Sequence, residues 1–401
     1  MNQNSTQPLP RTYDLILYGA TGFTGRRCVE YLVKHAPVGL RWAIAGRDLR
    51  KLELLSHEVE RPWVLADAND LESIDQMCSQ TRVILSTAGP FALYSEPVVT
   101  ACMEHQTHYV DITGETPWIK SLIDRYHERA QHSSVIILPA CGFDSVPSDL
   151  GVWLLKERGA PLEKVDAAFS LRGGFNGGTI ASALNLAESG ESRALSKRTL
   201  LCPEDHGLTE QPYDPHAVFW DSTRERWLVP FFMGPVNTRV VRRSASLMNY
   251  GDGFTYQEWM KMTSGLKAKL TLGALGIFNS GLKSRWGRHL IRLLSPRPGR
   301  GPSETAIREG YVKVHFLHRI DGLVRDSITL SVSGDPGNKV TCESVCEAAL
   351  ALIANEQVVS GGVLTPMSAL GNALWKRLND RGWSYESHMG SVGKDHEDHH
   401  S

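Results

Sequence analysis

The sequence predicts an α/β protein with a Rossmann-type, doubly wound parallel sheet and a second, α+β domain with a largely antiparallel sheet. The stretch from Asp14 to Glu30 reads as strand, glycine-rich turn and amphipathic helix. Five further short apolar segments follow before residue 150 and alternate with helix-length segments. Later, an Asp-Gly pair at 321–322 joins two apolar stretches, which is a strong signal of an antiparallel hairpin.

The composition is that of a large globular protein. The 401 residues are 41% hydrophobic and 22% charged, enough for two domains with substantial cores. The net charge of −1 gives no overall electrostatic argument for nucleic acid binding. The seven cysteines include no C-x-x-C pair, so neither a disulfide framework nor a metal site is indicated. With no signal-like start and no apolar run that could span a bilayer, we expect a cytoplasmic protein.

The glycine-rich turn is the first candidate binding site. A sharp turn requires Gly19, close approach of the backbone to a pyrophosphate requires Gly22, and tight packing of the helix requires Gly25. The helix start offers free N–H groups and a positive dipole end to phosphates. A turn without a ligand is the alternative, but the position between strand and helix favours a dinucleotide. The predicted contacts are Gly19, Ala20, Thr21, Gly22, Phe23, Thr24 and Gly25.

The end of the second apolar segment, 41–46, indicates which dinucleotide binds. NAD sites usually carry an acidic residue there, whereas this chain has Arg47. An arginine favours the 2′-phosphate and therefore predicts NADP(H). Arg50 and Lys51, one turn further on, either add to the same pocket or form a solvated helix face.

Two more strand ends complete the predicted cofactor site. Asp67 closes the third segment, where its carboxylate would accept a hydrogen bond from the adenine amino group; capping the next helix is the alternative. The fourth segment, 83–87, runs into Ala88, Gly89 and Pro90. We place this turn beside the nicotinamide ribose, because the fourth strand ends across the crevice from the first.

The candidate catalytic groups follow the fifth and sixth segments, 108–112 and 135–138. Both segments end at the same edge of the predicted sheet. There they supply Asp111, Glu115, Cys141, Asp144 and Ser145, and the neighbouring helix adds Tyr94. Each has a plainer reading, since Asp144 or Ser145 could cap the helix that starts near Pro147 and Cys141 could be a core residue.

Several motifs carry a family resemblance. GATGFTG, AIAGRD, STAGPF, DITGE and ACGFDSVPSDLGV together resemble the saccharopine dehydrogenase-like oxidoreductases, most closely the branch called trans-acting enoyl reductases. GGTIAS (177–182) and GGVLTPMSALG (361–371) extend the similarity over nearly all of the chain. The resemblance implies an NADP-type Rossmann domain, then an α+β domain whose sheet covers the nicotinamide, with the last helices returning to the first domain.

These observations divide the chain into five parts. We expect a disordered lead-in (1–12), an NADP-binding Rossmann domain (13–150) and an α+β substrate or dimerisation domain (151–360). A C-terminal helix (361–387) would return to the Rossmann domain, followed by a disordered, histidine-rich tail (388–401).

The resemblance implies reduction of an activated C=C bond in a lipid or polyketide acyl substrate by NADPH. We assign carbonyl polarisation and proton delivery to Tyr94, Asp144 and Ser145. A saccharopine-type amino-acid (C–N) dehydrogenase is one alternative, although residues 227–233 are apolar where a dicarboxylic substrate needs cations. The other is a non-catalytic NADP(H)-binding protein that associates with a membrane or a partner.

Segment 270–300 is the candidate partner surface. Residues 270–282 are mostly apolar, and residues 283–300 carry six lysines and arginines without an acidic residue. A core helix with a solvated basic face, an interfacial helix for peripheral membrane contact, and a docking surface for an acidic acyl carrier protein all fit this pattern. A homodimer also stays open.

Two other features of the second half leave alternatives open. The glycine-rich loop 172–178, before a helix predicted from Thr179, suggests close approach to a ligand or a hinge. Arg239, Arg242 and Arg243 are expected to form a surface cluster, or to pair with a phosphate or carboxylate.

Overall fold

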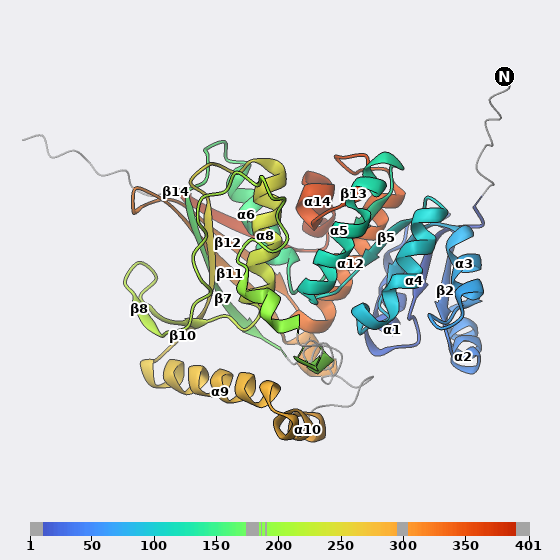
Figure 1. Cartoon of the computed structure of the whole chain (residues 1–401), viewed down its shortest axis with the longest axis horizontal. Helices are drawn as coiled ribbons and strands as arrows, with labels where there is room; N and C mark the ends of the chain where they lie inside the picture. The colour runs from blue at the N-terminus through green and yellow to red at the C-terminus, as the bar shows by residue number, and fades with distance from the viewer. Residues whose placement is uncertain (1–10, 174–183, 186, 189–190, 295–303, 390–401) are drawn as a thin grey trace, which may run out of the picture.

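The computed structural model describes residues 11–173, 184–185, 187–188, 191–294 and 304–389. The predictions for residues 1–10, for 174–183 with the helix start at Thr179, for 295–300 of the basic run and for 390–401 lie outside these ranges. The structure contains two seven-stranded sheets. The first sheet lies with its helices on the right of Figure 1, and the second sheet lies on the left. The predicted fold class is confirmed.

The first sheet is parallel throughout and has the strand order β13-β6-β5-β4-β1-β2-β3. Its interior strand β1 is fully buried from Leu15 to Leu17, which is why this segment reads as a continuous apolar run. The strands are β1 (Tyr13–Tyr18), β2 (Trp42–Gly46), β3 (Trp63–Leu65), β4 (Thr81–Ser86), β5 (His108–Asp111), β6 (Ile136–Leu138) and β13 (Gly362–Val363).

Six helices follow the first six strands in the order of a doubly wound fold. They are α1 (Phe23–His35), α2 (Leu49–Val59), α3 (Leu71–Ser79), α4 (Phe91–Glu104), α5 (Thr116–His132) and α6 (Val146–Lys156). Whereas α1 to α3 each bury one side, α6 is buried from Val146 to Leu155 because it lies between the two sheets.

The second sheet has the order β14-β12-β11-β7-β10-β9-β8 and is antiparallel except where β7 pairs with β10. The predicted hairpin is confirmed, because Asp321 and Gly322 take φ values of 51° and 81° and join β11 to β12. The strands are β7 (Lys164–Arg172), β8 (Phe219–Asp221), β9 (Arg226–Pro230), β10 (Thr255–Met262), β11 (Tyr311–Ile320), β12 (Leu323–Ser333) and β14 (Ser384–Met389).

The described strands show that the chain crosses between the sheets three times: from β6 to β7, from β12 to β13, and from β13 to β14. The return to the Rossmann domain begins with α12 (Thr341–Ile353), earlier than the expected segment 361–387. The thiols of Cys342 and Cys346 lie 3.7 and 3.9 Å from the α1 carbonyls of Thr24 and Cys28.

The end of the described chain differs from two expectations, a single helix over 361–387 and a tail starting at residue 388. Helices α13 (Pro366–Leu370) and α14 (Asn372–Asp380) follow β13, and β14 then pairs with β12. His388 and Met389 are therefore strand residues, because the edge of the second sheet offers them backbone partners.

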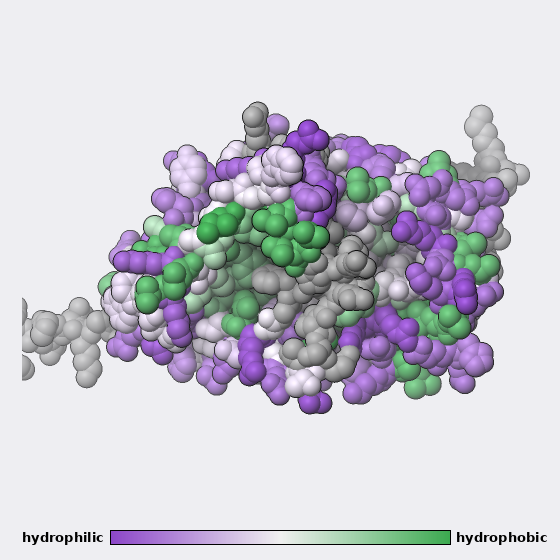
Figure 2. All heavy atoms as spheres, turned by 90° about the horizontal axis from the view of Figure 1, so that it is seen from below, coloured by the Kyte–Doolittle hydropathy of each residue, from purple (hydrophilic) through white to green (hydrophobic). Residues whose placement is uncertain are grey.

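The remaining elements belong to the second domain or its edge. They are the 3₁₀ helix η1 (Glu191–Ser196), α8 (Gly234–Met248), α9 (Gly265–Lys283), α10 (Arg285–Leu294), α11 (Glu304–Arg308) and the π-helical turn η2 (Pro336–Val340). α9 and α10 lie along the lower side of the molecule, where apolar side chains gather at the surface (Figures 1 and 2). The expectation of a packed helix with a solvated basic face is wrong for this segment.

The expectation of a surface cluster at Arg239, Arg242 and Arg243 is also wrong. All three lie on α8 and are at most 2% exposed. Arg242 donates to the carbonyls of Arg198 (2.9 Å) and Tyr256 (2.7 Å). Burial lowers the pKa of Arg242 and of Arg243 to about 10. A single helix can bury three cations because backbone carbonyls replace the lost water.

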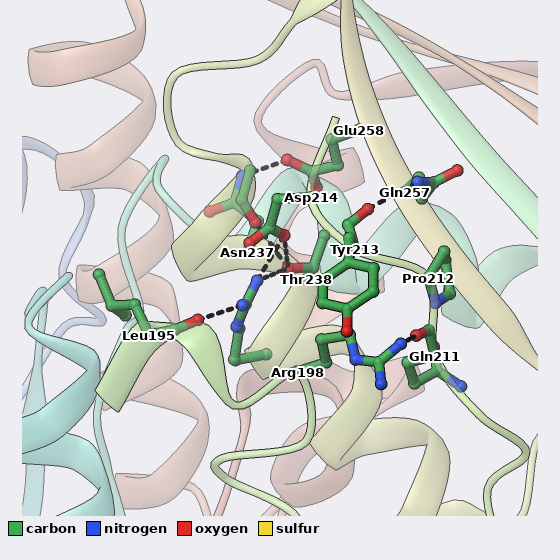
Figure 3. A network of polar contacts seen from close by, with 12 residues as sticks. Leu195, Arg198, Gln211, Pro212, Tyr213, Asp214, Asn237, Thr238, Gln257 and Glu258 are labelled. Atoms are coloured by element: carbon green, nitrogen blue, oxygen red, sulfur yellow. Dashed lines mark hydrogen bonds and ion pairs between the residues drawn. The ribbon is translucent and has the colours of Figure 1, made fainter. Parts of the chain in front are cut away.

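These arginines fix the long segment 195–214 to α8. Arg239 forms an ion pair with Asp214 and donates to the carbonyl of Leu195. Figure 3 shows this network, in which Thr238 donates to Asp214, Asn237 donates to Glu258, and Arg198 donates to the carbonyl of Gln211. The irregular segment is therefore held by side-chain hydrogen bonds where a strand ladder is missing.

The α6 helix makes its closest approach to the second sheet at Gly151. A Cβ atom there would lie 2.1 Å from two ring carbons of Phe316, which is fully buried on β11. We expect Gly151→Ala to lower the free energy of unfolding by about 1–3 kcal/mol through overpacking. Urea unfolding measures this, with Gly273→Ala as the matched helical control, because a Cβ on Gly273 meets nothing within 4 Å. An unchanged midpoint for Gly151→Ala would show that the ring yields without cost.

Candidate functional site

The glycine turn has the geometry that the sequence predicts. Gly19 takes a φ of +83°, which favours glycine, and a Cβ on it would lie 2.9 Å from the backbone nitrogen of Ala88. A Cβ on Gly25 would lie 2.1 Å from the carbonyl oxygen of Gly19. The hydroxyl of Thr87 donates to the carbonyls of Tyr18 and Gly19 at 3.2 Å, so the turn is fastened to the end of β4.

The start of α1 differs from the starts of the next three helices. Asp48 caps α2, Asp70 caps α3, and the Glu115 carboxylate accepts hydrogen bonds from the first two N–H groups of α4. At α1 the N-cap is Gly22, and no side chain of the described residues caps it. Its first turn holds no acidic residue. Free N–H groups at the positive end of a helix suit a phosphate, so the residues present fit a dinucleotide.

The remaining turn residues lie around this helix start. Ala20 is fully buried, and the Thr21 hydroxyl faces Gly46 at the end of β2. The ring of Phe23 lies 5.6 Å from the Arg27 guanidinium. Thr24 uses its carbonyl to accept from the Cys342 thiol of α12. The segment is thus held from both sides while Gly22 stays exposed.

Arg47 lies at the carboxyl end of β2 and is exposed. Its guanidinium makes no ion pair or hydrogen bond with the described part of the chain, whereas Lys51 pairs with Asp48 at 3.0 Å. Arg50 is exposed on the same helix. Arg47 is therefore available to an anion at this strand end, which is the position expected for a 2′-phosphate.

Asp67 does not cap α3, because Asp70 does. Instead, one Asp67 oxygen accepts from the backbone and side-chain nitrogens of Asn69, each at 3.0 Å. Asp67 is half-buried just after the end of β3, and its contact with the adenine stays a prediction.

The turn after β4 holds its backbone near the glycine turn. Ala88 and Pro90 are half-buried and Gly89 is exposed. Glu115 supports this turn by accepting from the N–H groups of Phe91 (2.9 Å) and Ala92 (3.0 Å). Glu115 is therefore a structural residue, and its role as a cap from a neighbouring loop is invisible in the sequence.

Asp111 and Cys141 are also structural. Asp111 is fully buried and accepts from the Tyr109 hydroxyl (2.9 Å) and the Thr113 N–H (2.9 Å). Burial raises its pKa to about 7. Burial also raises the pKa of the Cys141 thiol well above its ordinary value, so the reactive thiolate is disfavoured.

The three predicted catalytic residues have different surroundings. Asp144 is half-buried between β6 and α6, and its Oδ2 lies 3.4 Å from the position that a Cβ on Gly114 would take. Burial raises its pKa to about 6, and it makes no hydrogen bond or ion pair with the described residues. The buried Ser145 hydroxyl has no hydrogen-bond partner either. Tyr94 is half-buried in the first turn of α4, and no described contact joins it to Asp144.

The first turn of α6, which follows Asp144 and Ser145, contributes two residues that the sequence analysis did not assign. The Ser148 hydroxyl accepts from Asn237 (3.2 Å), which also donates to the buried Glu258 (2.9 Å). Asp149 accepts from the Ser244 hydroxyl and from the Met367 N–H (2.9 Å). The GFDSVPSD motif therefore joins the two domains. The signal in the sequence that could have indicated this role is a serine and an aspartate at the start of an otherwise apolar helix.

Other site types are not evident in the described residues. No group of three or more metal-ligating side chains occurs there, and the described helices include none that is long and apolar enough to cross a membrane.

Comparison with known proteins agrees with this geometry. The family model for the saccharopine dehydrogenase NADP-binding domain matches residues 15–138. A "putative trans-acting enoyl reductase" of Mycobacterium tuberculosis strain H37Rv is 36% identical over 415 residues, covering 94% of this chain and 98% of that protein. A trans-acting enoyl reductase of Mycobacterium ulcerans is 30% identical over 430 residues, covering 93% and 97%.

The fold also has a solved counterpart. Saccharopine dehydrogenase (L-Glu forming) from Saccharomyces cerevisiae superposes with a TM-score of 0.57 over 94% of this chain and all of that one, at 12% identity. At this identity the likeness concerns the fold alone. Together with the identity to the mycobacterial proteins, the matched domain shows that the chain belongs to the saccharopine dehydrogenase-like oxidoreductases, in the branch of trans-acting enoyl reductases, and has an NADP-binding domain.

Proposed function

We propose that this oxidoreductase reduces the C=C bond of a lipid or polyketide acyl substrate at the expense of NADPH. The observation that carries the proposal is Asp144, a carboxyl group with a raised pKa and no described partner at the carboxyl edge of the Rossmann sheet. A protonated carboxyl group there can deliver the proton that a reduced C=C bond needs. The names of the relatives support this class of reaction.

NADPH supplies the hydride when it is bound. In our proposal Asp144 holds the proton for the substrate α carbon. The unpartnered Ser145 hydroxyl and the Tyr94 hydroxyl are the proposed donors to the substrate carbonyl, where negative charge develops. The α1 start and Arg47 bind the phosphates and orient the cofactor.

Apolar groups of the second domain approach this edge. The Met233 Cε atom lies 3.8 Å from the position that a Cβ on Gly114 would take, close to Asp144. Next to it, Phe231 stacks on Phe169 with ring centroids 4.0 Å apart. Phe231 and Phe169 belong to the core, at 2% and 1% exposed, so Met233 is the apolar group that this edge offers, and it suits an acyl chain better than a charged amino acid.

The three arginines of α8, which follow Met233 in the chain, are already engaged. Arg239, Arg242 and Arg243 donate to backbone carbonyls or to Asp214. They would have to leave those partners to bind the carboxylates of a saccharopine-like substrate. This disfavours the C–N dehydrogenase and favours an acyl substrate, delivered in trans on an acidic acyl carrier protein.

The decisive test follows NADPH fluorescence decay with purified protein and three substrates: a 2-enoyl thioester, a 2-enoyl chain on a carrier protein, and lysine mixed with 2-oxoglutarate. Oxidation with the enoyl substrates, faster on the carrier, is the expected result. Oxidation with the lysine mixture alone would replace the proposal by the C–N dehydrogenase. Tight NADPH binding without turnover would indicate a non-catalytic protein.

The cofactor preference has its own test. We expect Arg47→Ala to weaken NADPH binding by about 10- to 100-fold, because a charge-assisted hydrogen bond is worth about 1.5–3 kcal/mol. NADH binding should stay unchanged, since it has no 2′-phosphate. Fluorescence titration measures both, with Arg82→Ala on β4 as the control. An equal loss for NADPH and NADH would contradict the assignment.

A further inference from the structure

Helices α9 and α10 expose large apolar side chains to an unusual extent. On α9, Leu266, Leu270 and Ile277 are 71%, 65% and 77% exposed. They are four and seven residues apart and therefore share one face of the helix. The helix is anchored at its other side, where Ala268 is buried and Gly265 packs against the Trp227 ring. The apolar stripe thus points away from the body of the protein.

On α10 the apolar and the charged face have exchanged their usual places. A surface helix normally packs its apolar face on the protein and exposes its charges. Here Arg288 and Arg292 reach the protein and form ion pairs with Glu188 at 3.5 and 2.5 Å. Trp286 and Leu293, on the opposite side, are 86% and 73% exposed. Figure 2 shows apolar side chains gathered over this part of the lower face.

Every lysine, arginine, aspartate or glutamate within the two helices is basic, and two of these cations, Arg288 and Arg292, are paired with Glu188. Residues 265–294 contain no aspartate or glutamate. The cations of the segment are Lys267, Lys269, Lys283, Arg285, Arg288 and Arg292. A two-fold contact with a second copy would bring these cations together, which is unfavourable. An anionic surface would pair with them while accepting the apolar stripe.

We propose that α9 and α10 form a docking face for an anionic lipid membrane. Leu266, Leu270, Ile277, Trp286 and Leu293 enter the boundary between headgroups and acyl chains, and the flanking lysines stay with the lipid phosphates. The helices lie flat on the surface, because α9 is too polar to cross a bilayer. This docking does not depend on which reaction the protein catalyses.

The experiment is co-sedimentation of the full chain with phosphatidylcholine vesicles, with or without one third phosphatidylglycerol. We expect binding to the anionic vesicles, weakening as salt rises. Replacing Lys267, Lys269, Lys283 and Arg285 with glutamine should weaken it by about fivefold for each charge removed. The triple variant Leu270→Ser, Ile277→Ser, Leu293→Ser should lose at least about tenfold.

The matched control is Val38→Ser, Leu54→Ser, Leu71→Ser, which removes three comparably exposed apolar residues from the Rossmann domain. It should bind vesicles like the original protein. Absence of vesicle binding, or equal loss in both triple variants, would overturn the proposal. The proposal would also be overturned if neither the original protein nor the α9–α10 triple variant bound vesicles, while that variant alone abolished a dimer or a complex with an acidic carrier protein.

Discussion

Asp144→Asn is expected to lower kcat by about 100- to 1,000-fold with NADPH affinity unchanged, because proton transfer by a placed side chain contributes about that much. Asparagine keeps the size of the side chain but holds no transferable proton. Asp144 itself has no described hydrogen bond to lose, so the fold should tolerate the change. The measurement is steady-state NADPH oxidation with the enoyl substrate, with an NADPH titration alongside.

The pH dependence distinguishes a proton donor from a merely structural residue. Since the pKa of Asp144 is raised to about 6, its protonated form disappears above that pH, and kcat should fall there. The Asp144→Asn variant should lack this fall, and Asp144→Glu should restore part of the rate. Full activity of Asp144→Asn would remove Asp144 from the reaction.

The raised pKa of Asp144 also predicts how the stability of the fold changes with pH. The unfolded carboxyl, with a pKa near 3.8, releases its proton before the folded one does. Asp144 therefore destabilises the fold increasingly as pH rises from about 4 to about 6, and the penalty then stays constant. Asp144→Asn should raise Tm at neutral pH and leave it unchanged below the unfolded pKa, which thermal unfolding at both pH values measures.

Gly25→Ala is expected to weaken cofactor binding strongly. The added Cβ would lie 2.1 Å from the Gly19 carbonyl oxygen and 2.8 Å from the Thr87 hydroxyl oxygen. The backbone of the turn must therefore move, and the phosphate-binding N–H groups move with it. A cost of about 3 kcal/mol would weaken NADPH binding by about 100-fold.

The control for Gly25→Ala is Gly276→Ala on α9, where an added Cβ meets nothing within 4 Å. It should bind NADPH normally and be at least as stable, because alanine favours a helix. Isothermal titration with NADPH compares the two. Normal affinity in Gly25→Ala would mean that the turn does not hold the phosphates.

The local part of the fold was predictable because its signals are local. Glycine spacing and apolar runs identified the first six strands of the first sheet but not β13, and Asp321–Gly322 identified the hairpin. The α8 arginines were misplaced because their partners, such as Leu195 and Val363, are far away in the sequence. Charge alone suggests exposure, and only the fold shows which carbonyls compensate for burial.

The candidate site, too, was predictable only where its signals are local in the sequence. The residues around the glycine turn lie together because they follow adjacent parallel strands, which sequence order predicts. The supporting contacts do not follow from that order: Thr87 fastens Gly19, and Glu115 caps α4. The exposed stripe of α9 was likewise ambiguous, since a helical apolar pattern does not say whether protein or lipid covers it.

The three chain crossings limit how the two sheets can move. Domains joined by one linker swing open about a hinge, whereas three connections constrain most rotations between them. The buried Asp149 and Arg243 hydrogen bonds to Met367 and Val363 stiffen the same junction. Rotation between the two sheets therefore has to bend three connections together and strain these buried hydrogen bonds, which a single-linker hinge avoids.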